Sequence, residues 1–436
     1  MRRIGFFILS LVAISSFFIS CLDSDVTYSN NPHVATFSIQ SDTLVPGIEN
    51  TVFTVDTLSK KIYNADSVTY GAKVTKLVPT VTFYKGASKI LVNGVEWNST
   101  DSLDFSSPLT MTFVATDGKT SVDYEVRINK HTVNPDQIIW TKKSSSISSL
   151  TGIKSQKAIW FNSKAYFFAQ DNSNTVIFTS QDGSSWANIG STSVSIDVNS
   201  IIQHNSKLFA VTTSNVLISS IDGIEWVNNG TTESNIKFMN TLCSLSGKLW
   251  VAGEDENNQL YLYSSTDGTT WTKSNALASN FPYLNQVKTT LTTKTNIAKA
   301  YSLGGSSQNS EYSEGVFSSM NGSYWINTLS DVNGFSFGLR KNAAGFSLDK
   351  KIFFFGGLNA TNEIVNDFYV SIDEGCTWKA AADYQKLPDT LGARKNASAF
   401  VDDNKNIWII GGESQSESLF DVWQGRLRKF DFLIQE

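Results

Sequence analysis

Five copies of one short pattern limit most strongly what this chain can fold into. Each copy reads Ser-x-Asp-Gly-x-x-Trp, with Asn for Asp in the fourth copy and one extra residue before the glycine in the fifth. The defining residues are Asp182, Gly183 and Trp186; Asp222, Gly223 and Trp226; Asp267, Gly268 and Trp271; Asn321, Gly322 and Trp325; and Asp373, Gly375 and Trp378. Successive tryptophans are 40, 45, 54 and 53 residues apart. Repeats of this length, filled with strand-like runs and no helical period, predict a β-propeller.

The pattern also predicts where each copy lies within its blade. A copy follows an apolar run, as at residues 176–178 and 260–263, so it marks a corner between two strands. The Asp or Asn side chain can accept hydrogen bonds from the N–H groups of the turn, and the glycine supplies a positive φ. The copies resemble the Asp-box of bacterial sialidases and related propellers. We expect a structural role, because turns spread around a ring cannot form one active site and Asn321 replaces a carboxylate that catalysis would need.

A sixth unit lacks this pattern. Gly411 and Gly412 end an apolar run, as Gly356 and Gly357 do in the unit before it, and both segments resemble kelch blades. With this unit we count six blades. We expect residues 137–143, which contain Trp140, to supply an outer strand that closes the ring against the C-terminal strands, because closure removes exposed sheet edges.

A second repeat contains two arginines that are candidates for ligand binding. Residues 338–346 match residues 392–400, a displacement of 54, and place Arg340 and Arg394 in corresponding positions before an inner strand. Two guanidinium groups near the mouth of the central channel could bind a carboxylate, sulfate or phosphate. The alternative is that each arginine ties its blade to the next through backbone carbonyls.

The first 33 residues have the pattern of an export signal and a tether. Residues 1–20 combine a basic start with an apolar run, as a signal peptide does. The residues ending at Cys21 resemble a bacterial lipobox, with Phe18 where leucine is usual, and the resemblance implies that Cys21 is acylated. We expect an exported protein anchored to the outer membrane through lipid on Cys21. Asp23 and Asp25, within the tether of residues 21–33, resemble a surface-export signal of some Gram-negative gut anaerobes; a solvated spacer is the alternative.

Residues 34–134 predict a small β-sandwich. Leu109, Met111 and Phe113 alternate with polar neighbours, and a second alternating run spans residues 122–128. Asp117 and Gly118 between these runs predict a hairpin turn. The segment 105–128 resembles cadherin-like sandwich modules of bacterial surface proteins. The leader and residues 62–67 resemble an uncharacterised lipoprotein family, domain of unknown function 6242, which implies no activity.

Composition restricts the classes of function. The net charge of −5 provides no basic excess for nucleic acid, and three His and three Cys leave little for a metal site, so we expect no cofactor. The chain is therefore predicted to be all-β, with an immunoglobulin- or cadherin-like sandwich followed by a six-bladed propeller at residues 135–436. We expect a monomeric, non-catalytic recognition protein that binds a glycan or an outer-membrane protein. The alternatives are a glycan-active enzyme, sialidase-like or another glycosidase, at the channel mouth, and a structural subunit of a surface complex.

Overall fold

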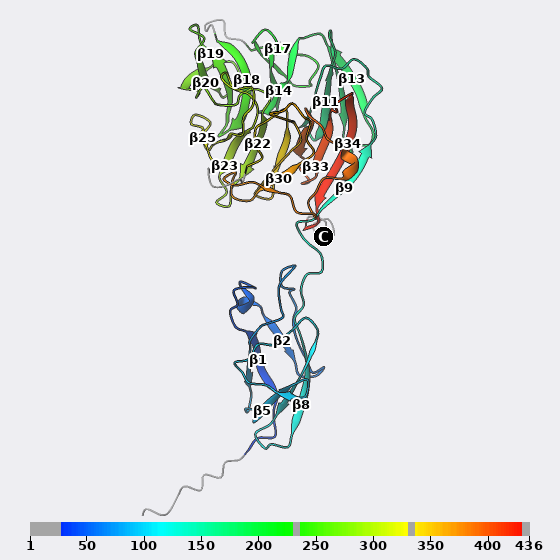
Figure 1. The fold of residues 1–436 in the computed structure, drawn as a ribbon, viewed down its shortest axis with the longest axis vertical. Coiled ribbons are helices and arrows are strands. Elements are labelled where there is room, and N and C mark those ends of the chain that lie inside the picture. The colour runs from blue at the N-terminus through cyan, green and yellow to red at the C-terminus, as the bar shows by residue number, and fades with distance from the viewer. Residues whose placement is uncertain (1–27, 230–235, 330–335, 430–436) are drawn as a thin grey trace, which may run out of the picture. The chain divides into compact units, whose positions relative to one another are not determined.

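The computed structural model describes residues 28–229, 236–329 and 336–429 (Figure 1). The expected signal peptide, residues 1–20, and the expected lipidation site, Cys21, lie outside these residues. The chain divides into two compact units between Asn134 and Pro135. No helix in the described segments is long and apolar enough to cross a membrane.

The N-terminal unit consists of two sheets around one apolar core. β1 (Val34–Ile39) pairs with β4 (Pro79–Phe83). A larger sheet has the order β2 (Phe53–Asp56), β3 (Lys61–Asn64), β8 (Ser121–Arg127), β7 (Leu109–Val114), β5 (Lys89–Val92) and β6 (Val95–Glu96), with a 3-10 turn at Ile48–Asn50 before β2. Side chains from both sheets, including Phe37, Met111 and Tyr124, form a shared core. This arrangement is sandwich-like.

The alternation predicted from the sequence is present in β7 and β8. Leu109, Met111 and Phe113 are buried on one face of β7, and the two strands are antiparallel neighbours. The carboxylate of Asp117 accepts hydrogen bonds from the N–H groups of Lys119 and Thr120, and Gly118 has φ +71°. The turn therefore forms where the sequence predicted it.

The C-terminal unit contains six four-stranded sheets within the described residues. In chain order their strands are β10 (Ser155–Phe161), β11 (Lys164–Gln170), β12 (Thr175–Ser180) and β13 (Ala187–Thr192); β14 (Ile196–His204), β15 (Lys207–Thr212), β16 (Leu217–Ser220) and β17 (Val227–Asn228); β18 (Lys237–Leu245), β19 (Lys248–Glu254), β20 (Leu260–Ser265) and β21 (Thr272–Ala276); β22 (Val287–Thr292), β23 (Ala298–Leu303), β24 (Val316–Ser319) and β25 (Ile326–Asn327); β27 (Ala344–Leu348), β28 (Lys351–Phe355), β30 (Phe368–Ser371) and β31 (Lys379–Ala380); and β32 (Ser398–Val401), β33 (Ile407–Glu413), β34 (Ser418–Leu427) and β9 (Ile138–Ser144). A short pair, β26 (Arg340–Lys341) and β29 (Leu358–Asn359), and a 3-10 turn at Asp389–Leu391 complete the unit.

The first strands of the six sheets form the innermost layer of a ring. Each contacts the first strand of the next sheet, and β32 contacts β10. The ring also closes through its outermost strand, because β9, from the start of the unit, pairs with β34 near the end of the chain. The predicted six-bladed propeller, and its closure by the segment that contains Trp140, are confirmed.

Candidate functional site: the central channel

The five repeated turns form as the sequence predicted, between the third and fourth strands of their blades. In every copy the Ser Oγ accepts a hydrogen bond from the N–H of the glycine, at 2.8–2.9 Å. Asp182 Oδ1 accepts two more from Ser184 and Ser185, and Asn321 Oδ1 accepts the equivalent pair from Ser323 and Tyr324. An amide oxygen thus replaces the carboxylate without loss of these contacts. These contacts give the serine, the Asp or Asn and the glycine of each copy a role in forming the turn.

The fifth copy accommodates its extra residue locally. Glu374 adopts a positive φ of 60°, and Gly375 still donates to Ser371 Oγ. The indole N–H of Trp378 donates to the Gly375 carbonyl, as in three of the other copies within the described residues. The extra residue of the fifth copy therefore changes the loop but keeps the hydrogen bonds of Ser371 and Trp378 to Gly375.

Arg340 and Arg394 are buried and bonded within the propeller. Arg394 is 2% exposed, and its Nη1 donates to Asp421 Oδ1 at 2.8 Å and to the Gly411 carbonyl at 2.9 Å. Arg340 makes the same contacts with Asp367 and the Gly356 carbonyl. These guanidinium groups therefore bind groups of their own blades, which accounts for them without the ligand that the sequence analysis considered.

The backbone of the same arginines connects neighbouring blades. The Arg340 carbonyl accepts from Gly305 N–H, and the Arg394 carbonyl accepts from Gly357 N–H, both across a blade boundary. Gly304 and Gly305 have positive φ values of 59° and 93°, so the fourth blade carries a third paired-glycine turn that the sequence analysis did not identify. Neighbouring blades are thus joined by the main chain at these two positions, whereas the guanidinium groups bond within their own blades.

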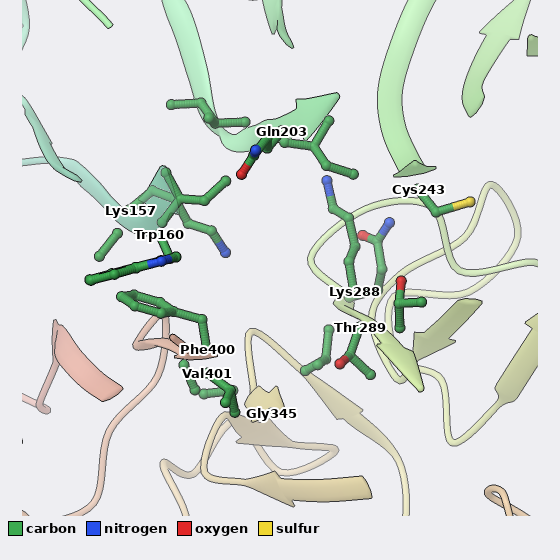
Figure 2. Close-up of a pocket in the computed structure, with 18 of the residues that line it drawn as sticks. Lys157, Trp160, Gln203, Cys243, Lys288, Thr289, Gly345, Phe400 and Val401 are labelled. Atoms are coloured by element: carbon green, nitrogen blue, oxygen red, sulfur yellow. The ribbon is translucent and has the colours of Figure 1, made fainter. Parts of the chain in front are cut away.

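A cavity of about 390 Å³ lies inside the ring, lined by residues of all six blades (Figure 2). Its walls come from the six innermost strands and the residues just before them. The lining includes Lys157, Trp160, Gln203, Gln286, Lys288, Thr289, Thr290 and Phe400. None of the described residues that line it is Asp or Glu.

One wall of the cavity is aromatic. Trp160 of β10 and Phe400 of β32 lie against each other across the boundary between the first and sixth blades, as Figure 2 shows, with ring centroids 6.4 Å apart. The indole N–H of Trp160 donates to Asp403 Oδ2 at 3.0 Å, which fixes the orientation of the ring. Both side chains are partly buried and contribute apolar surface to the cavity.

Two lysines extend into the cavity from the strands that line it (Figure 2). Lys288 Nζ donates to Asn240 Oδ1 at 2.9 Å, to the Asn199 carbonyl at 3.2 Å and to Thr241 Oγ1 at 3.2 Å. Desolvation in the channel, together with the nearby charge of Lys157, lowers the pKa of Lys288 to about 7. Desolvation also lowers the pKa of Lys157, although the charge of Asp197 acts in the opposite direction.

Asparagines from five blades line a second, smaller cavity. They are Asn199, Asn240, Asn285, Asn342 and Asn396, and Lys157 and Gln286 lie beside them. The last three asparagines have φ values near +55°, and their backbones are connected by hydrogen bonds from Asn342 N–H to the Asn285 carbonyl and from Asn396 N–H to the Asn342 carbonyl. Asn342 and Asn396 belong to the arginine-containing repeat, so residues of that repeat line this cavity.

The described residues include two cysteines without a disulfide, Cys243 and Cys376, of which only Cys376 is exposed. Cys243 is buried in β18, and burial raises the pKa of its thiol to about 12. No group of three or more His, Cys, Asp or Glu side chains within the described ranges is arranged to hold a metal ion. His204, the last residue of β14, is buried; its Nε2–H donates to the Thr266 carbonyl at 3.3 Å, and its Nδ1 lies 2.8 Å from Ser244 Oγ.

The fold and the channel define a six-bladed β-propeller protein with a sandwich-like N-terminal domain. Residues 134–435 match the family model described as the DUF6242 beta propeller domain, and residues 26–128 match the one described as the DUF6242 N-terminal domain. The chain belongs to this family, as the resemblance in the sequence indicated. It is also similar to a solved structure titled "Structure of YjhT", with a TM-score of 0.46 and 12% identity, over 64% of this chain and 96% of that chain. No curated protein matches the chain.

Proposed function

We propose that this protein is an exported lipoprotein whose propeller recognises a glycan in the central channel without cleaving it. The observation that supports the proposal most strongly is the aromatic wall of Trp160 and Phe400 beside free polar groups in one cavity. Sugar rings have apolar C–H faces that pack on aromatic rings, and hydroxyl groups that bond to amides and amines. Both kinds of partner are present here.

The polar lining includes groups that have no partner inside the protein. Both polar atoms of the Gln286 side-chain amide are buried and without a hydrogen bond in the described structure. Buried polar groups are almost always bonded, and leaving one unbonded costs about 1–3 kcal/mol. A bound hydroxyl or acidic group would satisfy this amide, which supports recognition at this position.

The lining favours recognition over hydrolysis. Glycosidases ordinarily use two carboxyl groups on either side of the scissile bond. The acidic residues near the cavity have other roles: Asp403 holds the Trp160 indole, and Asp197 interacts electrostatically with the two lysines. A carboxylate pair beside Arg340 and Arg394 would have favoured an enzyme, but Asp367 and Asp421 are bound to those arginines.

The proposal places the protein at the outer membrane through lipid on Cys21, with the N-terminal domain as a spacer. Growth with an alkyne-tagged fatty acid should label the full-length chain, and Cys21→Ser should remove the label. Labelling that is unchanged in Cys21→Ser would contradict the lipid anchor while leaving the channel site untouched.

The binding test uses residues 28–436 on an immobilised panel of host and dietary glycans, with retained protein and released sugar recorded together. We expect binding without release, and loss of binding in Trp160→Ala. Tyr324→Ala is the matched control, because this aromatic side chain is 66% exposed outside the channel. Released sugar would overturn the non-catalytic assignment. Equal loss of binding in both variants would show that the channel is not the binding site.

A protein-docking role has one observation in its favour. The residue after the serine in three of the repeated turns is apolar and more than 60% exposed, namely Ile221, Met320 and Ile372. These positions belong to the second, fourth and fifth blades, so they are separate apolar points that a partner protein could contact. If the glycan panel retains nothing, a photo-crosslinker at Met320 is the next experiment.

A further inference from the structure

The two channel lysines differ in how completely their ammonium groups are satisfied. Lys288 has three donors and three acceptors, one from each of Asn199, Asn240 and Thr241. Asn240 is itself held by donating to the Tyr283 carbonyl at 2.7 Å. Lys288 is therefore held in place by the protein's own acceptors, and all three of its donors are used.

Lys157 has no such set of acceptors. In the described part of the chain its Nζ has neither a hydrogen bond nor an ion pair, although it lines both cavities. Asp197 interacts with it only at a distance. An amine that is desolvated and unpaired beside a second cation destabilises the folded protein, and such groups concentrate at sites that bind an opposite charge.

The surroundings of Lys157 are those of an anion site within a sugar-binding cavity. The described lining contributes two lysine amines and no carboxylate, and Asp197 outside the lining acts on them only electrostatically. The unbonded Gln286 amide supplies a neutral donor in the same cavity. A carboxylate or sulfate at Lys157 would pair the amine and reduce the repulsion from Lys288, and such charge-assisted hydrogen bonds are about twice as strong as neutral ones.

We infer that the ligand of the channel is an acidic glycan whose carboxylate or sulfate group binds Lys157. This inference rests on the proposed function, because it assigns the chemical class of the ligand to the same site. The anionic group is part of the sugar. The sugar ring packs against Trp160 and Phe400, and its charged group lies at Lys157.

The first test compares three galactose-based oligosaccharides: oligogalacturonate, a sulfated galacto-oligosaccharide and the neutral galactan. The same comparison is made between any glycan that the panel retains and its carboxyl-reduced or desulfated form. We expect the acidic member to bind at least about tenfold more tightly, which is the size of one charge-assisted contact. The acidic group of the ligand is identified by which oligosaccharide, the carboxylate or the sulfate one, shows this increase in affinity. Equal affinity for acidic and neutral partners overturns the inference and leaves glycan recognition in place.

Lys157→Met removes the charge and keeps a side chain of similar length. Lys207→Met is the matched control at an exposed position. Lys157→Met should reduce binding of the acidic oligosaccharide about tenfold or more while leaving the neutral one unchanged, and Lys207→Met should change neither. An equal loss for both oligosaccharides in Lys157→Met would contradict an anion contact.

A third measurement does not depend on glycan binding. Acetate and sulfate, compared with chloride at equal ionic strength, should raise the melting temperature of the unmodified protein more than that of Lys157→Met. Equal shifts in the two proteins overturn the anion site. A lysine-dependent shift with no glycan retained on any panel would instead mean that the anion site exists and the proposed glycan function is wrong.

Discussion

Gly183 of the first blade lies directly against the indole of Trp408 in the sixth blade. A Cβ added at Gly183 would be 2.2 Å from Cζ3 of that ring, so only glycine fits. The same relationship occurs between Gly268 and Phe209, and between Gly322 and Trp250, where the added Cβ would also be 2.2 Å from the ring. In each pair the glycine belongs to the repeated turn of one blade and the aromatic residue to the second strand of the preceding blade. The repeat is therefore a contact between blades as well as a turn.

Gly183→Ala should destabilise the propeller beyond the cost of its positive φ. The control is Gly247→Ala, because both glycines have φ +72° and Gly247 has open space around it. We expect the control to cost about 1–2 kcal/mol from backbone strain. Gly183→Ala should cost about 1–3 kcal/mol more from overpacking. Urea unfolding measures both, and equal losses would mean that the contact with Trp408 does not matter.

The repeated turns should contribute a pH-dependent stability that Asn321 lacks. Hydrogen bonds from the turn N–H groups hold the pKa of Asp267 below its ordinary value of 3.8. A lowered carboxyl pKa stabilises the folded state above the unfolded pKa, and this contribution is lost as the pH falls through the folded one. The free energy of unfolding of Asp267→Asn should therefore fall less than that of the unmodified protein between pH 6 and pH 3. Identical pH profiles would contradict this account.

The sequence predicted the fold well because the features that build a propeller are local. The spacing of the turns, the paired glycines and the alternation in residues 109–128 all act over a few residues, and each corresponds to an observed element. The closing strand could be predicted because an unpaired outer strand was required somewhere. What the sequence pattern did not show was which aromatic residue each turn glycine contacts, since that contact crosses a blade boundary.

Arg394 should be more important for stability than for binding. Removing it leaves Asp421, which is 9% exposed, without its cationic partner. Breaking a buried pair in this way costs about 3–5 kcal/mol. Arg394→Ala should therefore lower the melting temperature strongly, whereas Lys386→Ala, at an exposed pair with Asp383, should change it little. A stable Arg394→Ala protein that has lost glycan binding would restore the original ligand-binding interpretation of this arginine.

Deletion of residues 135–145 should unfold the propeller. This segment contains β9, which pairs with β34 from Ile138 to Ser144 and whose Trp140 donates to the Lys386 carbonyl. Without it the outer edge of the sixth blade is exposed. In calorimetry, the full chain should show one unfolding transition for each of its two units. The deletion should remove the propeller transition and leave that of the N-terminal unit, whose core shares no residue with the deleted segment. An unchanged melting curve would refute closure by this strand.

Lys157→Met should stabilise the protein, and the gain should shrink as the pH rises. Desolvation lowers the pKa of Lys157 below its ordinary 10.5, so the unfolded chain binds more protons and the stability of the unmodified protein rises with pH up to that value. Asp197 and Lys288 interact electrostatically with Lys157, and the thiol of Cys243 lines the same cavity. Thermal melts of both proteins at pH 6, 8 and 10 measure the difference. A loss of stability in Lys157→Met at pH 6 would show that the amine is a structural group.

The candidate site was harder to predict than the fold, for a physical reason. Arginine in a repeat suggested a ligand, but Arg340 and Arg394 occupy equivalent positions because they perform the same packing role. Lys157 and Lys288 are not part of any repeat. They become neighbours only because the ring brings β10 and β22 to a common channel. A signal was available in retrospect, because each lysine lies in the innermost strand of its blade, and these strands line the channel.

The most direct test of the account is a crystal structure of residues 28–436 with an acidic oligosaccharide that the chain binds. We predict density for a sugar ring against Trp160 and Phe400, with its carboxylate or sulfate within hydrogen-bonding distance of Lys157 Nζ. A bound oligosaccharide on the outer face of the blades, with the channel holding only solvent, would contradict the assignment of the channel as the binding site.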